Sequence, residues 1–111
     1  MPNEVILIPS FQEKLRESGY RSHLKIISKL IKKLEKTGKN ALKILDVEDY
    51  YLLCEMKLMK PPYRLYAIVD QKNNKYYVVE WEHKEKQEKV INQLKSKLSL
   101  ATKFGLDKIF T

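Results

Sequence analysis

The sequence predicts an α+β fold in which an antiparallel β-sheet is covered by helices from both ends of the chain. Between residues 50 and 84, apolar and polar residues are arranged as three consecutive strands, rich in aromatic and β-branched side chains. Turn-forming residues interrupt this stretch at 60–62 and at 71–74. Helical patterns precede and follow it. We expect a single domain over residues 1–111, because the chain is too short for two ordinary domains.

The composition is that of a globular protein, with 43% hydrophobic and 32% charged residues. The single cysteine, Cys54, excludes an intramolecular disulfide and a multi-cysteine zinc site, and we expect it to be buried in a strand. No apolar run approaches the roughly 20 residues that span a bilayer. The N-terminal residues lack the basic start and apolar core of a signal peptide, which predicts a cytoplasmic protein without membrane contact.

The net charge of +8 favours a polyanionic partner. Nucleic acid is the most common such partner, and an acidic protein is equally admissible. Lysine supplies 19 of the 22 basic residues, and the three arginines are Arg16, Arg21 and Arg64. Diffuse lysine is also typical of a soluble surface, so solubility remains an alternative explanation of the charge.

The N-terminal third predicts a strand and two helices. Residues 5–8 form a short apolar run, typical of a strand buried on both faces, and Pro9 ends it. Ser10 and Glu13 have the spacing of a capping box that begins the first helix, and Gly19 is expected to close it.

A second helix is predicted from Ser22 to Gly38, because apolar residues recur there with helical period. His23 lies in its first turn, where we expect a surface role. Residues 42–45 predict a weak strand before the meander. A third helix is expected from Lys84 onward, followed by an apolar tail, residues 100–110, that docks on the domain.

Standard catalytic motifs are absent. The sequence contains no glycine-rich phosphate loop, no metalloprotease or serine-hydrolase motif and no cysteine–histidine metal set, so we expect neither a metal nor a cofactor. The polar residues of the meander are the remaining candidates.

Arg64 follows a Pro-Pro-Tyr turn at the start of a strand, a rigid place to mount a guanidinium that can bind phosphate with two donors. The alternative is an ion pair with Glu55 or Glu80 across the sheet. Glu55 and Lys57 alternate onto one face of the preceding strand, where they would lie beside Arg64 or form a surface ladder of charges.

His83 ends the last strand and has a pKa suited to proton transfer near neutrality, although an exposed strand-end histidine is an equal alternative. The aromatic residues of the strands could stack on single-stranded RNA, but packing is the more common role of such residues. They are Tyr63, Tyr66, Tyr76, Tyr77 and Trp81.

In order and spacing, these parts resemble the RelE/ParE superfamily of toxins from type II toxin–antitoxin systems. The resemblance is carried by Tyr51-Leu52-Leu53-Cys54-Glu55-Met56-Lys57, by Pro62-Tyr63-Arg64-Leu65-Tyr66, and by a last strand that runs into a basic segment at residues 78–86. It implies a twisted, antiparallel-dominated sheet with an N-terminal helical hairpin and a C-terminal helix.

The resemblance also implies a metal-independent endoribonuclease that cleaves mRNA at the ribosome, inhibits translation and is neutralised by a cognate antitoxin. Arg64, His83, Glu55 and Lys57 would then be catalytic, with Arg64 and His83 close enough to share one phosphate. The residues implied to bind RNA are Lys57, Lys60, Arg64, Lys84, Lys86 and Tyr66.

Two departures from the family leave other functions open. Glu55 places an acidic residue where the best-known member is basic, and the terminal helix offers no tyrosine. One alternative is a ParE-type inhibitor of a protein target such as DNA gyrase, because ParE relatives share the fold without ribonuclease activity. Another is a degenerate homologue that only binds antitoxin or RNA.

Overall fold

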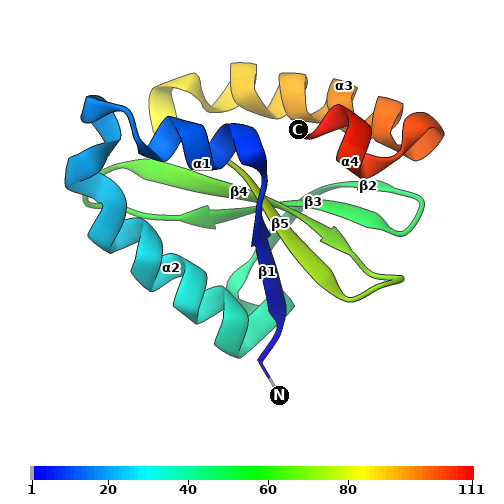
Figure 1. Cartoon of the computed structure of the whole chain (residues 1–111), viewed down its shortest axis with the longest axis horizontal. Helices are drawn as coiled ribbons and strands as arrows, with labels where there is room; N and C mark the ends of the chain where they lie inside the picture. The colour runs from blue at the N-terminus through cyan, green and yellow to red at the C-terminus, as the bar shows by residue number, and fades with distance from the viewer. Residues whose placement is uncertain (1) are drawn as a thin grey trace.

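A five-stranded mixed sheet, twisted across its width, forms the centre of the computed structural model, which describes residues 2–111 (Figure 1). The elements in chain order are β1 (Glu4–Leu7), α1 (Pro9–Leu15), η1 (Ser18–His23), α2 (Leu24–Thr37), η2 (Gly38–Ala41), β2 (Lys43–Glu48), β3 (Tyr51–Lys57), β4 (Tyr63–Asp70), β5 (Lys75–His83), η3 (Lys84–Lys86), α3 (Gln87–Phe104) and α4 (Leu106–Ile109). The strand order is β1-β5-β4-β3-β2. β1 runs parallel to β5, and the other pairs are antiparallel. The predicted α+β class is confirmed.

The predicted meander is present as β3, β4 and β5, and β2 extends it by one strand. The weak strand expected at residues 42–45 is therefore a full strand of six residues. Its pairing with β3 shifts register between Ile44 and Asp46, so that Leu45 forms a β-bulge. A two-residue turn joins β2 to β3, with Asp49 at a positive φ of 53°.

Helices cover the sheet on its two sides, with α2 on one side and α3 on the other (Figure 1). The strand register sorts the polar candidates between these two faces. We call the first the α3 face; its residues include Glu55, Lys57, Arg64, Tyr66, Glu80 and Glu82. We call the second the α2 face; its residues include Cys54, Met56, Tyr63, Leu65, Trp81 and His83.

The N-terminal segment departs from the prediction in three places. β1 is an edge strand with one neighbour and is only partly buried, so burial on both faces was wrong. The capping box does not form, because Pro9 begins α1 with Ile8 as its N-cap and Ser10 lies inside the helix. Gly19 does not close α1, which ends at Leu15; a 3₁₀ segment, η1, joins it to α2.

The C-terminal segment follows the prediction more closely. Residues 84–86 form a 3₁₀ turn, and α3 begins after it at Gln87. Gly105, at a φ of 99°, ends α3 and lets the chain reverse into α4. Leu106 and Phe110 are buried, so the end of the predicted tail docks on the domain. The first part of the tail instead continues α3, and its Leu100 and Phe104 are exposed. In residues 2–111 no helix is long and apolar enough to cross a membrane.

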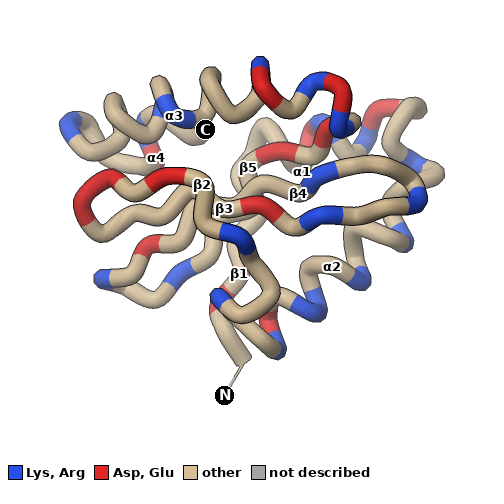
Figure 2. Tube along the Cα trace, turned by 180° about the vertical axis from the view of Figure 1, so that it is seen from behind, with Lys and Arg blue, Asp and Glu red and all other residues tan. Residues whose placement is uncertain are grey.

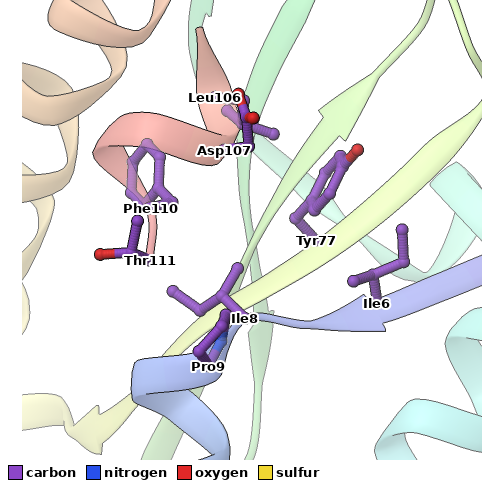
Figure 3. A pocket seen from close by; sticks show the side chains of 8 residues that line it. All are labelled: Ile6, Ile8, Pro9, Tyr77, Leu106, Asp107, Phe110 and Thr111. Atoms are coloured by element: carbon purple, nitrogen blue, oxygen red, sulfur yellow. The ribbon is translucent and has the colours of Figure 1, made fainter.

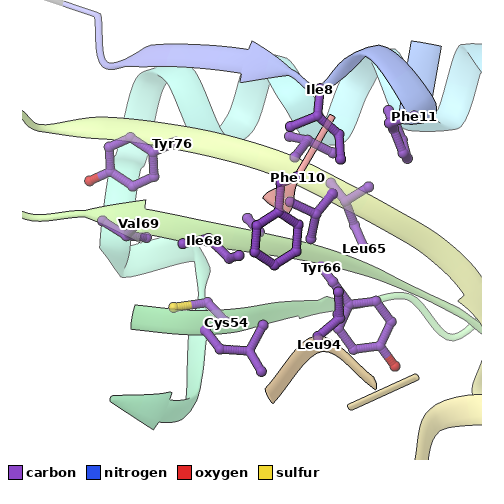
Figure 4. Packing of buried hydrophobic residues seen from close by; sticks show 14 of the residues in the cluster. Ile8, Phe11, Cys54, Leu65, Tyr66, Ile68, Val69, Tyr76, Leu94 and Phe110 are labelled. Atoms are coloured by element: carbon purple, nitrogen blue, oxygen red, sulfur yellow. The ribbon is translucent and has the colours of Figure 1, made fainter. Parts of the chain in front are cut away.

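One apolar core joins both ends of the chain to the sheet. Ile8 and Phe11 from the N-terminal segment and Phe110 from the tail belong to the same buried cluster as residues of the central strands (Figure 4). Cys54 is fully buried, as predicted, and burial raises the pKa of its thiol to about 12, although the charge of Lys39 lowers it in part.

Candidate functional site

Lys57 and Arg64 form a cross-strand pair at the end of the meander, next to the turn that joins β3 to β4. Both point to the α3 face, since directly opposed residues of an antiparallel pair share a face. The register places Glu82 of β5 on the other side of Arg64. The predicted proximity of Arg64 to Lys57 is therefore confirmed. In Figure 2 the basic segments of β3 and β4 lie side by side near this turn.

These residues line an open groove of about 530 Å³ between the sheet and the N-terminal end of α3. The residues around it come from four segments of the chain: Asn40, Ala41, Leu42, Lys43, Glu55, Lys57, Arg64 and Gln87. Three are cationic and one is anionic, so the groove carries a net positive charge. Its charge favours an anionic ligand, and its volume lies in the range of small-molecule pockets.

The Arg64 guanidinium is buried in the wall of the groove, with 7% of the residue exposed. Its Nη1 donates to the carbonyl oxygens of Leu58 and Tyr63, at 3.3 and 3.2 Å, which holds the side chain against the β3–β4 turn. Its Nε is buried and donates to no acceptor within residues 2–111. A buried donor without an acceptor costs about 1–3 kcal/mol.

The acidic residues nearest in register to Arg64 are paired with lysines instead. Lys14 of α1 bonds to Glu80 and lies 3.6 Å from Glu82, and Lys86 lies 4.0 Å from Glu82. Burial lowers the pKa of Lys14, but the hydrogen bond and charge of Glu80 outweigh it and raise that pKa above 10.5. Within residues 2–111 no carboxylate lies within 4.0 Å of Arg64, so the alternative of an ion pair with Glu55 or Glu80 is wrong.

Glu55 places the one carboxylate of the groove beside these cations. It is 4% exposed, and its Oε2 accepts a hydrogen bond of 3.3 Å from Nε2 of Gln87, the first residue of α3. Lys43 of β2 lies opposite Glu55 in register but makes no salt bridge with it in the described chain. The Gln87 amide therefore holds the Glu55 carboxylate by a hydrogen bond, and no cation of the described chain forms a salt bridge with it.

Tyr66 lies opposite Glu55 and has no exposed surface, so the predicted stacking on a base is wrong. Its Oη is buried without a partner in residues 2–111. Burial is the largest cause that raises its pKa to about 12; the charge of Glu55 adds to this, and that of Arg64 opposes it. Trp81 and Tyr76 are also buried, which confirms packing as the role of these aromatics.

His83 does not join the groove. It lies opposite Tyr63 on the α2 face, whereas Arg64 lies opposite Glu82 on the α3 face. Its ring contacts Tyr63 edge-on, with ring centroids 5.3 Å apart, and its Nδ1 accepts the backbone N–H of Glu85. The prediction that Arg64 and His83 share one phosphate is wrong, because one residue of offset along a strand reverses the face.

His23 is a structural residue, contrary to the predicted surface role. Its Nδ1 accepts the indole N–H of Trp81 at 3.0 Å. Tyr63 stacks on Trp81, with centroids 5.0 Å apart and an interplanar angle of 16°, and the His23 ring meets Tyr63 edge-on. This cluster fastens the start of α2 to the sheet on the face opposite the groove.

The other predicted RNA-binding lysines lie around the groove without lining it. Lys60 is exposed in the β3–β4 turn, and Lys84 and Lys86 are exposed at the turn before α3. Lys84 lines a shallow depression next to the groove, and Gln87 lines both. The sequence did not identify Lys43, Asn40 or Gln87 as site residues. Of these three residues, only Lys43 could have been found from the sequence, by pairing the strand predicted at residues 42–45 with the first strand of the meander.

A separate pocket of about 240 Å³ lies between β1, β5 and α4 (Figure 3). Its lining is mostly apolar, with Ile6, Ile8, Leu106 and Phe110 around the ring of Tyr77. Apart from Tyr77, one of the aromatic residues considered for stacking, none of the candidate residues lines it. Within residues 2–111 no cluster of three or more histidine, cysteine or acidic side chains could hold a metal ion.

Comparison of the chain with protein-family models, with curated proteins and with solved structures found no match. The functional assignment therefore rests on the geometry of the groove.

Proposed function

We propose that the groove binds a phosphate of single-stranded RNA and that the protein is a RelE/ParE-like toxin that cleaves mRNA there. One observation carries the proposal: Arg64 is buried without a carboxylate partner beside Lys57, in a groove with net positive charge. A structural arginine in a small domain normally has a carboxylate partner. Here Glu80 and Glu82 are paired with lysines, and Glu55 accepts a hydrogen bond from Gln87 without a salt bridge to Arg64, which leaves the guanidinium to an external anion.

The reaction that these groups support is attack of a ribose 2′-oxygen on the adjacent phosphorus. The P–O2′ bond forms and the P–O5′ bond breaks, which yields a 2′,3′-cyclic phosphate and a free 5′-hydroxyl. Glu55 accepts the proton of the 2′-hydroxyl, since it is the carboxylate that lines the groove. Arg64 and Lys57 stabilise the charge that develops on the phosphate oxygens.

The leaving 5′-oxygen takes its proton from a lysine ammonium of the groove, Lys57 or Lys43. His83 has no part in this mechanism, because it lies on the other face of the sheet. The exposed residues Lys60, Lys84 and Lys86 attract the flanking phosphates of the strand. Neutralisation by a cognate antitoxin and action at the ribosome in the cytoplasm belong to the same proposal.

The test is controlled expression in a bacterial host, with mRNA ends mapped, together with cleavage of RNA by the purified protein, with and without ribosomes. Wild-type protein is expected to arrest growth and to produce cyclic phosphate ends. Arg64→Ala, Arg64→Lys and Glu55→Gln are each expected to abolish cleavage, and His83→Ala to retain it. Arg64→Lys keeps the positive charge and most of the packing but removes the planar guanidinium and its paired donors. Circular dichroism of this variant shows whether the fold is retained when cleavage is lost.

The proposal fails if Arg64→Lys and Glu55→Gln remain fully toxic. Growth arrest with intact mRNA and altered DNA supercoiling would instead identify an inhibitor of gyrase. Absence of any phenotype and of any RNA cleavage would identify a protein that only binds its partner.

A further inference from the structure

The second edge of the sheet, formed by β2, is unpaired and carries exposed apolar residues. β2 pairs with β3 on one side only. Ile44 and Val47, both on the α2 face, are 54% and 57% exposed. An edge strand presents free backbone donors and acceptors that can pair with another strand.

From the pattern of this edge we propose that β2 pairs antiparallel with β2 of a second copy of this chain. A two-fold axis perpendicular to the sheet would join the two sheets into one. This pairing goes beyond the proposed function, and it does not depend on whether the groove cleaves RNA.

The side chains of β2 are self-complementary in the register described next. If Lys43 lies opposite Glu48 of the second copy, then Ile44 lies opposite Val47, and the two-fold axis repeats both pairs. The dimer would gain two pairs of opposite charge on one face and two apolar pairs on the other. Each such cross-strand pair is worth about 0.2–1 kcal/mol.

The β-bulge at Leu45 makes this register possible. In a regular strand, residues five positions apart point to opposite faces. The extra residue in β2 returns Glu48 to the α3 face, where Lys43 also lies, and leaves Ile44 and Val47 together on the α2 face. A shift of one residue in either direction would oppose side chains from different faces, whereas a shift of two residues, with Lys43 opposite Asp46, again opposes side chains of one face. The proposed register is the one of these two that pairs Ile44 with Val47, the exposed apolar residues of the strand.

The strand carries charges of both signs, since it contains Lys43, Asp46 and Glu48. In the proposed register each Lys43 lies opposite a Glu48 of the second copy. Figure 2 shows acidic segments at the end of β2 that enters the turn. The strand spans about 20 Å, at about 3.3 Å per residue, so we expect a weak dimer that dissociates on dilution.

Sedimentation equilibrium of the full chain, treated to remove nucleic acid, tests the proposal over a wide concentration range. Wild-type protein is expected to show a monomer–dimer equilibrium. Lys43→Glu and Glu48→Lys should each weaken it by roughly tenfold, since each substitution replaces two opposite-charge pairs by two like-charge pairs. An equimolar mixture of the two variants should restore wild-type dimerisation, and so should the double variant Lys43→Glu/Glu48→Lys. Monomeric wild-type protein, or failure of the mixture and the double variant to dimerise, would overturn it.

Disulfide trapping tests the register independently. Chains with Ile44→Cys should form disulfides under mild oxidation with chains that carry Val47→Cys, because the two positions face each other. Neither variant alone should cross-link to itself, and the buried Cys54 does not compete. Efficient self-linking of either variant, or no link in the mixture, would refute the register.

Discussion

Lys57 and Arg64 face each other across β3 and β4, but only Lys57 is exposed. Arg64 is held by two backbone carbonyl groups of the adjoining turn, whereas the Lys57 ammonium makes no salt bridge in the described chain. The pair thus combines the buried Arg64 guanidinium, which is fixed by hydrogen bonds, with the exposed Lys57 ammonium. We expect Arg64 to determine where a phosphate sits and Lys57 to contribute long-range attraction.

Lys57→Met is expected to weaken binding of single-stranded RNA and to lower the dependence of affinity on salt. Removal of one phosphate contact changes the slope of log K against log salt concentration by about 0.7 for a single strand. Fluorescence anisotropy at several salt concentrations measures both quantities. Lys72→Met is the matched control, because Lys72 is equally exposed but lies in the β4–β5 turn, away from the groove. An unchanged slope would show that Lys57 contacts no phosphate.

Lys14→Met is expected to weaken RNA binding several-fold, although Lys14 does not line the groove. Its removal leaves Glu82 with Lys86 alone, at 4.0 Å, so that Glu82 can pair with Arg64 and compete with phosphate. Replacement of Glu82 by Gln in the same chain should recover most of the affinity. The loss of stability should stay near or below about 1 kcal/mol, because the ion pairs are partly exposed. Equal RNA affinity of the wild-type, Lys14→Met and Lys14→Met/Glu82→Gln proteins would contradict competition between Glu82 and phosphate for Arg64.

Tyr66→Phe is expected to leave RNA affinity unchanged and to raise the free energy of unfolding by about 1 kcal/mol. The hydroxyl is buried without a partner, so its removal relieves a desolvation cost and breaks no hydrogen bond. Urea denaturation and anisotropy titration measure the two effects. Reduced affinity in a well-folded Tyr66→Phe protein would show that the ring or its hydroxyl reaches the ligand after a rearrangement.

His23→Ala is expected to destabilise the protein by about 1–3 kcal/mol, because the buried indole N–H of Trp81 loses its acceptor. Trp81 is the only tryptophan in the sequence, so its fluorescence reports the change directly. His83→Ala serves as the comparison, since His83 accepts a backbone N–H and contacts Tyr63 at the partly exposed end of β5 but accepts no buried indole N–H. Similar losses in both variants would argue against a special role for the indole contact.

Cys54 is expected to make the protein less stable in alkali. Its folded pKa, about 12, lies above the ordinary value of 9.0, so the contribution to stability is complete below pH 9 and declines as pH rises toward 12. By pH 10 the loss from this group should be about 1 kcal/mol. Comparison of unfolding free energies of wild-type and Cys54→Ala protein from pH 8 to 10.5 isolates the effect. The native thiol should also resist alkylation at pH 8, and rapid labelling would contradict its burial.

Local patterns in the sequence predicted most of the secondary structure. Alternation along β3 and β4, the two turns of the meander and the periodicity of α2 are short-range features, and they specify strands, turns and helices directly. The capping box at Ser10 and Glu13 failed because Pro9, with its fixed φ, begins the helix two residues earlier than an N-cap at Ser10 would. The role of His23 was missed because its partner, Trp81, is 58 residues away.

The sequence by itself determined the α+β class, the meander and the pairing of Lys57 with Arg64, because all of these follow from neighbouring strands and a short turn. Only the tertiary structure decided that Arg64 is free of carboxylates, since Lys14 reaches Glu80 and Glu82 from a helix that is distant in the chain. Only the structure placed His83 on the opposite face from Arg64 and brought Lys43 and Gln87 to the groove. These outcomes depend on register, on the bulge at Leu45 and on helix packing, and such long-range relations leave no pattern within a single segment.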